Sequence, residues 1–457
     1  MNNLSHIWQS HRQTISILVM VFLLAFVGVN QSWVLALSIF NLCLISAIMA
    51  LGVNIQWGYA GLFNIGIMGF AALGGLSVVL ISAPSVPMAV SAGGMKMLFA
   101  LCLLLLSIVL SVYLSKHKYN KGWAVLSLVA GYFSMRYFYV DAAQAIEAVN
   151  PSKTGYLGGL GLPVPLAWLA GGLLAAGAAW LIGKITLGLR SDYLAIASFG
   201  IAEIVLYIIK NEDWIARGVK NVTGLPRPVP LEIDLQQSPW FEEMVVWFNQ
   251  SSLSLLTEVE KTKALGILLR EYSVVFVKLC YSGLFLAILV ALIVMANLAF
   301  DSPWGRKVRA IRDNETAASA MGKNVKRQHL QIFIIGSAIV GIAGALLVTY
   351  TGQFTPNSYQ SLRFTFLIWV MVIVGGSGNN FGSVIGAFFI WFFWVESTPM
   401  GLWLAETVQN FAGADNGVSA FLQERAHFLR YIFMGLIMLL VLRFAPGGIL
   451  PEKDKKL

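Results

Sequence analysis

Long apolar runs separated by short polar segments make up most of the chain. They cover roughly residues 15–29, 33–53, 59–82, 97–114, 121–140, 164–183, 193–210, 272–299, 330–351, 362–376, 381–395 and 428–445. A helix needs about 20 apolar residues to cross the hydrocarbon core of a bilayer. Because several runs are short or closely spaced, the pattern predicts an all-α polytopic membrane protein with about ten to twelve spans, some of them broken or re-entrant. We expect residues 1–457 to form a single transmembrane domain.

Composition and charge support this prediction. The chain is 58% hydrophobic and 12% charged, whereas soluble domains carry about 25% charged residues. The net charge is +9, which in a soluble protein would suggest nucleic acid as a partner. In a polytopic membrane protein, positive charge gathers instead in cytoplasmic loops that face anionic lipid. We therefore expect the basic surface to meet membrane lipid and no nucleic acid.

The segment 302–329 is the most basic interruption of the apolar second half. Ser302 and Pro303 are typical of the N-cap and the first position of a helix, and Gly322 is typical of a helix end. The sequence therefore predicts a helix over residues 302–322, one side of which carries Arg306, Arg309 and Arg312. Two interpretations stay open. The segment is either an ordinary cytoplasmic loop or a helix on which a soluble partner docks.

Lysine and arginine in short loops predict the orientation, because they favour the cytoplasmic side. The segment 302–329 carries seven of them, namely Arg306, Lys307, Arg309, Arg312, Lys323, Lys326 and Arg327. Counting spans from this segment places both termini on the cytoplasmic side as well. The same count places two inserts on the outer side, 141–163 and the longer 211–271. A loop as long as the second is normally functional or separately folded.

Glycine is concentrated in two segments, 57–75 and 375–386. Small residues four apart, as in Gly382 with Gly386 or in the row Ser337, Gly341 and Ala345, favour close helix packing. Glycine-interrupted spans also mark the translocation path of many transporters. On that interpretation the path passes near Asn64, Gly375, Gly376, Asn379 and Asn380. The alternative for residues 375–380 is a tight turn between two short spans.

Glu203 is an acid well inside an apolar run, DYLAIASFGIAEIVLYIIK. An acid within the membrane is costly and is expected to face protein or water. It could form a structural hydrogen bond or ion pair between helices. It could also act as a gate, contact the amino group of a substrate, or carry protons in a secondary transporter.

No residues in the chain suggest catalysis. The sequence lacks a glycine-rich phosphate-binding loop ending in Gly-Lys-Ser or Gly-Lys-Thr. The five histidines are scattered and fit no catalytic or metal-binding group, and the three cysteines lie in apolar runs without metal-ligand spacing. We therefore expect no enzyme activity, no metal and no cofactor in this chain.

Several stretches, taken together, resemble one known family. They are GYAGLFNIGIMGFAALGG, LGLRSDYLAIASFGIAEIV, SPWGRKVRAIRDNETAASAMGKNVKRQHLQIFIIGSAIVGIAGAL, VMVIVGGSGNNFGSVIGAFF and RYIFMGLIMLLVLRFAPGGILPE. In this order they resemble bacterial ABC-transporter permeases for branched-chain amino acids, of the LivM type. The resemblance covers most of the apolar chain. The sequence departs from a minimal member of the family through the inserts near 84–160 and 211–271.

The resemblance implies an importer subunit in the bacterial inner membrane. Its expected partners are a second homologous permease, two cytoplasmic ATPase subunits and a periplasmic binding protein. Its expected substrate is a branched-chain or other neutral amino acid, with urea or an amide as the alternative. Segment 302–329 would be the cytoplasmic coupling loop, and 141–163 and 211–271 would be periplasmic. The ATPase contacts would be Arg309, Arg312, Glu315, Ala317, Ala318 and Gly322, with Thr316 inserted into the family's Glu-Ala-Ala pattern.

Overall fold

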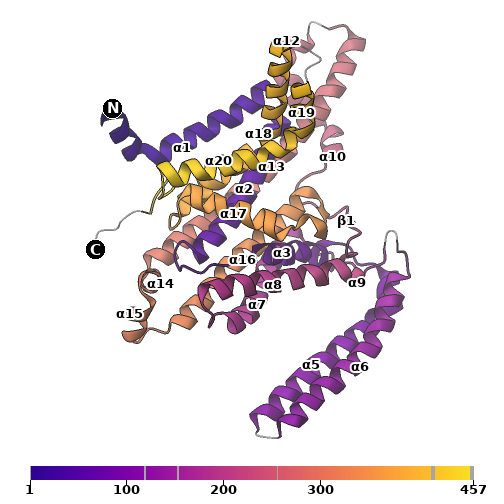
Figure 1. Ribbon diagram of the computed structural model, residues 1–457. Helices are drawn as coiled ribbons and strands as arrows, with labels where there is room; N and C mark the ends of the chain where they lie inside the picture. Colours follow the sequence, from indigo (N-terminus) through magenta and orange to yellow (C-terminus); the bar gives the residue numbers. More distant parts are fainter. Residues whose placement is uncertain (1, 118–119, 152–153, 255, 413–416, 453–457) are drawn as a thin grey trace.

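The computed structural model of the chain describes residues 2–117, 120–151, 154–254, 256–412 and 417–452 (Figure 1). Over these ranges the chain is helical apart from turns and two short strands, β1 (Val222–Thr223) and β2 (Gln353–Phe354), which pair antiparallel. The helices that match the apolar runs are α1 (Asn2–Asn30), α2 (Trp33–Gln56), α3 (Ile67–Ser82), α5 (Met95–Lys116), α6 (Lys121–Glu147), α7 (Val164–Thr186), α8 (Ser191–Asn211), α13 (Glu258–Asp301), α16 (Val325–Thr351), α17 (Ser361–Gly375), α18 (Asn380–Ala412) and α20 (Leu429–Phe444).

Nine helical stretches within the described ranges are long and apolar enough to cross a membrane. Two shorter apolar helices, Ile67–Ser82 and Ser361–Gly375, accompany them. Together with α6, they correspond one to one to the apolar runs of the sequence. The prediction of an all-α polytopic membrane protein is therefore confirmed.

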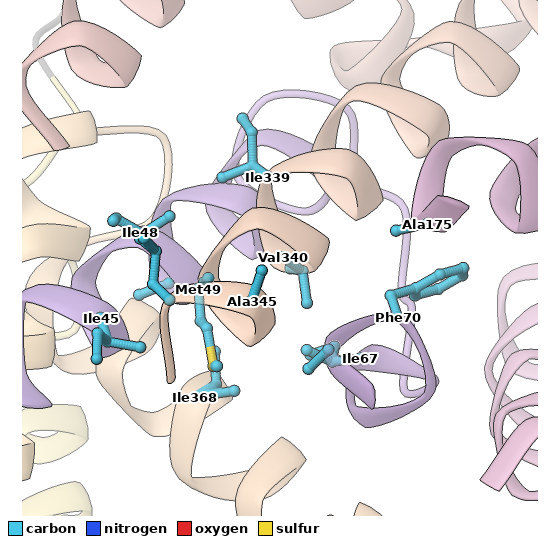
Figure 2. Packing of buried hydrophobic residues seen from close by; sticks show 14 of the residues in the cluster. Ile45, Ile48, Met49, Ile67, Phe70, Ala175, Ile339, Val340, Ala345 and Ile368 are labelled. Atoms are coloured by element: carbon cyan, nitrogen blue, oxygen red, sulfur yellow. The ribbon is translucent and has the colours of Figure 1, made fainter. Parts of the chain in front are cut away.

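The centre of the bundle is formed by α2, α3, α7, α16 and α17. Helix α16 packs against α2, α3 and α7, and α17 packs against α2 and α18. Figure 2 shows part of this core, to which Ile48 of α2, Phe70 of α3 and Val340 of α16 contribute. Helices α5 and α6 pack mainly on each other and form a hairpin that stands away from the rest in Figure 1. This hairpin accounts for much of the insert near 84–160.

Glycine lets the central helices approach closely. A Cβ added to Gly341 of α16 would lie 2.5 Å from Ala175 Cβ and 2.6 Å from the carbonyl oxygen of Gly171, both on α7. Ser337 and Ala345 of the same row are fully buried. Gly375 of α17 meets Gly382 and Gly386 of α18 in the same way. The sequence prediction of close packing at these small residues is confirmed.

Replacing Gly341 with leucine is expected to destabilise the bundle by about 3 kcal/mol, because the added side chain must displace α7 from α16. The amount of chain in the membrane and its melting temperature in detergent measure this effect. The matched control is Gly177→Leu on α7, where a Cβ would meet no atom within 4 Å. Equal stability of the two variants would contradict the packing argument.

Two predicted segments differ from the structure. The run 59–82 becomes helical only at Ile67, because residues 57–66 form a turn and an extended connection. The helix expected over 302–322 is two helices, α14 (Pro303–Asp313) and α15 (Glu315–Ala320), separated by Asn314 in an extended conformation. The Ser302 hydroxyl accepts from Trp304 N–H and caps α14, and Gly322 has a φ of +75°. The predicted start and end of the helical segment are therefore correct.

The expected loop 211–271 is largely folded. It contains α9 (Asp213–Ala216), α10 (Glu232–Gln236), α11 (Pro239–Phe248) and α12 (Gln250–Leu253). Helix α13 then begins at Glu258, where Thr257 and Glu260 form a capping box. The remaining short elements are α4 (Pro87–Ala89), η1 (Val90–Gly94), η2 (Pro356–Ser358), α19 (Gly417–Arg425) and η3 (Ala426–Phe428).

Candidate functional site

Helix α14 is attached firmly to the bundle at the end where α13 stops and α16 starts, which we call the loop end (Figure 1). Its apolar side, with Val308 and Ile311, is buried. Trp304 donates from Nε1 to Gln331 Oε1 of α16 at 3.1 Å. The apolar side of α14 therefore packs against the protein itself.

Arg306 and Arg309 bind the end of α13. Arg309 donates from a guanidinium nitrogen to the carbonyl oxygen of Phe300 at 2.8 Å, and Arg306 donates to that of Asp301 at 3.4 Å. The last carbonyls of a helix have no partner within the helix, and cations stabilise that end. Arg309, predicted as an ATPase contact, is thus used in a contact inside the chain.

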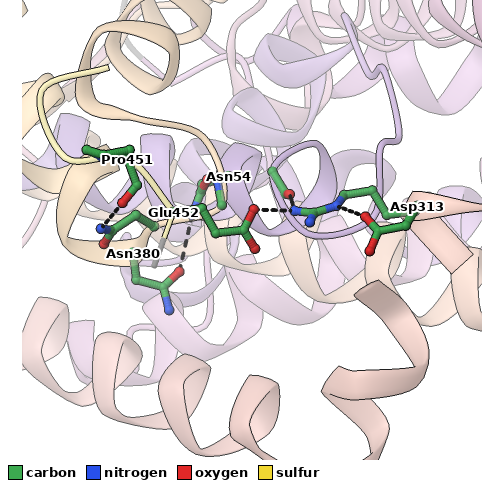
Figure 3. Close-up of polar contacts among 9 residues, drawn as sticks. Asn54, Asp313, Asn380, Pro451 and Glu452 are labelled. Carbon is green, nitrogen blue, oxygen red and sulfur yellow. Dashed lines mark hydrogen bonds and ion pairs between the residues drawn. The ribbon is translucent and has the colours of Figure 1, made fainter. Parts of the chain in front are cut away.

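Arg312 makes the longest-range contact of α14 (Figure 3). Its Nη1 donates to the carbonyl oxygen of Gly58 at 2.6 Å and to Glu452 Oε2 at 2.9 Å. Its Nε donates to Asp313 Oδ1 at 3.1 Å. Burial acts to lower the pKa of Arg312, but the bonds to Glu452 and Asp313 outweigh it, so the pKa is raised. Arg312 therefore stays charged and joins α14 to the C-terminal segment and to the turn after α2.

Residues 375–380 form the turn between α17 and α18. Gly376 and Gly378 have φ angles of +115° and +81°, which favour glycine. Asn379 Oδ1 accepts from the N–H groups of Phe381 and Gly382 at 3.0 and 3.2 Å, so it caps α18. This geometry is that of a tight turn between spans, which the sequence left open as the alternative to a segment near the translocation path.

Three asparagine side chains join the helices at this turn. Asn380 Nδ2 donates to Asn297 Oδ1 of α13 at 2.8 Å, and Asn54 Nδ2 of α2 donates to Asn380 Oδ1 at 3.2 Å. Asn54 Oδ1 in turn accepts from Gly378 N–H at 2.9 Å. We call these residues and the adjoining partners of Arg312 the loop-end cluster; it comprises Asn54, Gly58, Asn297, Arg312, Gly378, Asn380 and Glu452. The two hydrogen-bonded groups share no bond, but they touch where Gly58 lies against Asn54 and Gly378.

A polar cavity of about 270 Å³ lies beside the loop-end cluster. Gln13, Asp301, Arg309 and Asn379 are among its lining residues. The asparagine amides hold three helices, α2, α13 and α18, in one arrangement, since a buried amide that loses its partner is costly. Any movement of α14 must therefore change the bonds of Arg312 or carry the cluster with it.

Helix α15 differs from α14 because it is exposed. Glu315, Ala317 and Gly322 are exposed and Ala318 is half-buried. Asn314 Oδ1 accepts from Ala317 N–H at 2.9 Å and caps the helix. The predicted coupling residues on α15 are thus accessible to a partner. Helix α14, which is bonded to the bundle, directly precedes them in the chain.

Asn64 and Glu203 lie apart from the loop-end cluster. Asn64 is buried, donates to Gln56 Oε1 and accepts from Gly66 N–H, both at 2.9 Å, so it shapes the turn before α3. Glu203 lies on the exposed side of α8, beside Ile204 and Tyr207. Within the described residues it forms no hydrogen bond or ion pair. The described part of the chain therefore contains no side chain that binds Glu203 in the way expected of an acid within the membrane.

The sequence interpretation missed Asn54, Asn297 and Glu452. The two asparagines carried a signal, because Asn297 lies inside an apolar run and Asn54 directly follows one, and a polar side chain there is costly unless it is hydrogen-bonded. The bond between Arg312 and Glu452 spans 140 residues of sequence, and nothing local predicts it. A buried acid, Glu396, was also missed because α18 continues beyond the expected run; it accepts from Gln31 Nε2 at 2.9 Å.

Comparison with known proteins places these features in a family. The profile of the family described as branched-chain amino acid transport system / permease component matches residues 35–442. The probable branched-chain amino acid transport permease protein LivM of Methanocaldococcus jannaschii is 31% identical over 170 residues, 37% of this chain and 45% of that protein. The high-affinity branched-chain amino acid transport system permease protein LivM of Escherichia coli is 26% identical over 264 residues, 57% of each chain.

A sugar permease is also similar over a shorter region. The xylose transport system permease protein XylH of Haemophilus influenzae is 31% identical over 147 residues, 31% of this chain and 33% of that protein. The chain thus spans about half the length of the LivM relatives and about a third of the length of the xylose permease. No solved structure matches.

The family profile covers most of the chain, including the central helices and the segment with α14 and α15. Members of this family are non-catalytic membrane subunits. Within the described residues, no group of three or more histidine, cysteine, aspartate or glutamate side chains could hold a metal ion. The chain is a multi-pass membrane protein and belongs to the branched-chain amino acid transport permease family.

Proposed function

We propose that the chain is the permease subunit of an ATP-driven ABC importer for branched-chain or other neutral amino acids. The observation that carries this proposal is the contrast between α14 and α15. Helix α15 is exposed and carries Glu315 and Ala317, whereas α14 is bonded to four other parts of the chain. A partner that moves α15 would act on the bundle through α14.

The predicted coupling residues then divide into two groups. Glu315, Ala317, Ala318 and Gly322 are available to contact an ATPase subunit. Arg309 and Arg312 instead transmit the movement to α13 and to the loop-end cluster. Nucleotide binding in the ATPase can bias the bundle only if the contacts of these residues differ between its conformations.

The proposed assembly contains a second homologous permease, two cytoplasmic ATPase subunits and a periplasmic binding protein. The distribution of lysine and arginine supports a cytoplasmic loop end, with both termini on that side of a bacterial inner membrane. The segments 141–163 and 211–271 would then face the periplasm, where they are available to the binding protein.

Sugar transport is the second candidate because the xylose permease relative shares about a third of its length with this chain. Uptake of labelled leucine, xylose and urea by cells that carry the complete transporter separates the candidates. We expect leucine uptake that stops when ATP is depleted and persists when a protonophore removes the proton gradient at constant ATP. Uptake of xylose or urea alone would overturn the amino acid assignment.

Replacing Glu203 with glutamine tests the proton-coupled alternative. We expect the variant to keep its uptake, within about twofold, and the same pH dependence, because Glu203 is exposed and has no bonded partner within the described chain. Uptake is measured between pH 5.5 and 8, with Asp192→Asn at the start of α8 as the control. Loss of a pH-dependent component in the Glu203 variant alone would favour a proton carrier.

A further inference from the structure

An open groove of about 590 Å³ lies where α17, α18 and α20 meet (Figure 1). Its lining is mostly apolar, and Arg363 of α17 is the charged residue among the described residues that line it. Leu362 and Phe366 of α17 also line the groove and are 70% and 56% exposed. Helix α20 leaves most of its large apolar side chains exposed. Because the chain is a membrane protein, we expect lipid to meet such a surface.

Arg363 lies in the first turn of α17 and has no anionic partner. Within the described part of the chain it forms no ion pair and no hydrogen bond. Its Cζ atom lies 5.0 Å from the centre of the Trp394 ring, 5.4 Å from that of Phe364 and 5.8 Å from that of Tyr431. Its Nε is enclosed, so the donors that remain accessible are those on Nη1 and Nη2. A guanidinium presents its donors as a planar fork, which matches the oxygens of a phosphate or carboxylate.

The surroundings of Arg363 are positively charged. The Cζ atom of Arg430, on α20, lies 5.2 Å from the centre of the same Trp394 ring. Arg430 donates to a carbonyl oxygen and to a threonine hydroxyl but forms no ion pair within the described residues. The start of α17 adds partial positive charge, because Gln360 supplies no side-chain cap to its N–H groups. Two arginines and an uncapped helix start, with no acid paired to them, favour the binding of an anion.

The aromatic rings beside Arg363 indicate the level of the lipid headgroups. Trp394 and Tyr431 pack edge to face, with their ring centres 5.7 Å apart. Tryptophan and tyrosine gather where the membrane meets water, and long cationic side chains extend to the same level. Phe366 and Met434, about one turn further along α17 and α20, continue the groove as an apolar surface. The groove therefore combines a cation at headgroup level with apolar lining beyond it.

We propose that this groove binds an anionic phospholipid, whose phosphate accepts hydrogen bonds from Nη1 and Nη2 of Arg363. One acyl chain of the lipid lies along Phe366 and Met434. A zwitterionic lipid with a choline group is disfavoured, because it brings a further cation close to Arg363 and Arg430. A free anion is disfavoured as well, because it leaves the apolar lining in contact with water. The proposal does not depend on which solute the transporter carries.

Replacing Arg363 with glutamine tests the headgroup contact. Binding of phosphatidylglycerol to the complete transporter in detergent, measured by native mass spectrometry, is expected to weaken about tenfold or more, because the charged hydrogen bonds to the phosphate are lost. Arg363→Lys keeps the charge without the fork, so its affinity is expected to lie between those of the wild type and Arg363→Gln. The matched control is Arg425→Gln, because Arg425 lies over the Phe421 ring at 4.9 Å but does not line the groove. That variant keeps the wild-type affinity.

A second variant tests the acyl-chain part of the groove and leaves Arg363 in place. A Cβ added to Gly435 would meet no atom within 4 Å, so Gly435→Leu is expected to fold and to fill part of the groove. We expect it to weaken phosphatidylglycerol binding about tenfold, because the acyl chain loses apolar contacts. The control is Gly283→Leu on α13, where a Cβ would be equally free but lies outside the groove.

The same measurements identify the occupant. The wild-type transporter is expected to bind phosphatidylglycerol about tenfold more tightly than phosphatidylcholine, and inorganic phosphate is expected not to displace it. A benzophenone side chain in place of Leu362, in membranes that contain the complete transporter, is expected to cross-link to phospholipid. Equal binding of the two lipids, displacement by phosphate, or unchanged phosphatidylglycerol binding in both Arg363→Gln and Gly435→Leu would overturn the proposal. Cross-linking of position 362 to a protein subunit would also overturn it and would identify the groove as a subunit interface.

Discussion

Replacing Arg312 with alanine is expected to lower solute uptake by about tenfold or more while the chain still inserts into the membrane. The variant leaves the carbonyl oxygen of Gly58 and Glu452 Oε2 without this donor. A partly buried acceptor that loses its partner costs about 1–3 kcal/mol, and 1.4 kcal/mol corresponds to a factor of ten. The cost falls on the connection between α14 and the loop-end cluster, because the central core of α2, α3, α7 and α16 does not involve Arg312.

Uptake of labelled leucine, normalised to the amount of chain in the membrane, measures this effect. Arg306→Ala is the matched control, because its contact with the carbonyl oxygen of Asp301 is longer, 3.4 Å, and exposed. The charge-swapped double variant Arg312→Glu with Glu452→Arg is expected to recover part of the activity, since it restores an ion pair. Wild-type uptake in Arg312→Ala would show that the loop-end cluster does not transmit movement.

The helices were predictable from sequence because the apolar runs carry the information locally. Every run contains one helix in the structure, and the cap at Ser302 and the helix end at Gly322 occur where the residue types predict them. The break at Asn314 was also readable in principle. Asn314 is followed by Glu315 and caps Ala317 N–H, a pattern typical of a second helix start.

The loop-end cluster was not predictable, because its bonds join distant parts of the sequence. Arg312 and Gly58 are 254 residues apart, and Asn54 and Asn380 are 326 apart. An arginine row on an amphipathic helix is compatible with a docking surface and with internal anchoring. Only the packing of Val308 and Ile311 against the bundle fixes which side of α14 is covered.

Glu203 shows a different limit of sequence reasoning. The rule that an acid within a membrane faces protein or water holds for the complete assembly. In the single chain Glu203 is exposed beside Ile204 and Tyr207, whereas Glu396 is buried against Gln31. The apolar pattern does not distinguish the two, because it does not tell which side of a helix packs against the rest of the chain.

Replacing Ala317 with arginine is expected to uncouple the transporter without unfolding it. Ala317 is exposed on α15, and arginine is a good helix former, so the melting temperature of the chain stays unchanged. A long charged side chain in place of a small one would hold a docked ATPase away from the helix. The loss of a well-packed interface residue costs about 2–3 kcal/mol, which corresponds to a roughly thirty- to hundredfold loss of coupled uptake.

ATP hydrolysis by the purified complex, with and without loaded binding protein, measures the coupling. We expect the basal rate of the ATPase subunits to remain and its stimulation to disappear in Ala317→Arg. Lys323→Ala is the control, because Lys323 follows Gly322 and lies beyond α15. If both variants keep full stimulation, α15 is not the docking helix. If Ala317→Arg loses stimulation while Arg312→Ala keeps it, the partner docks on α15 but the movement enters the bundle by another route than the loop-end cluster.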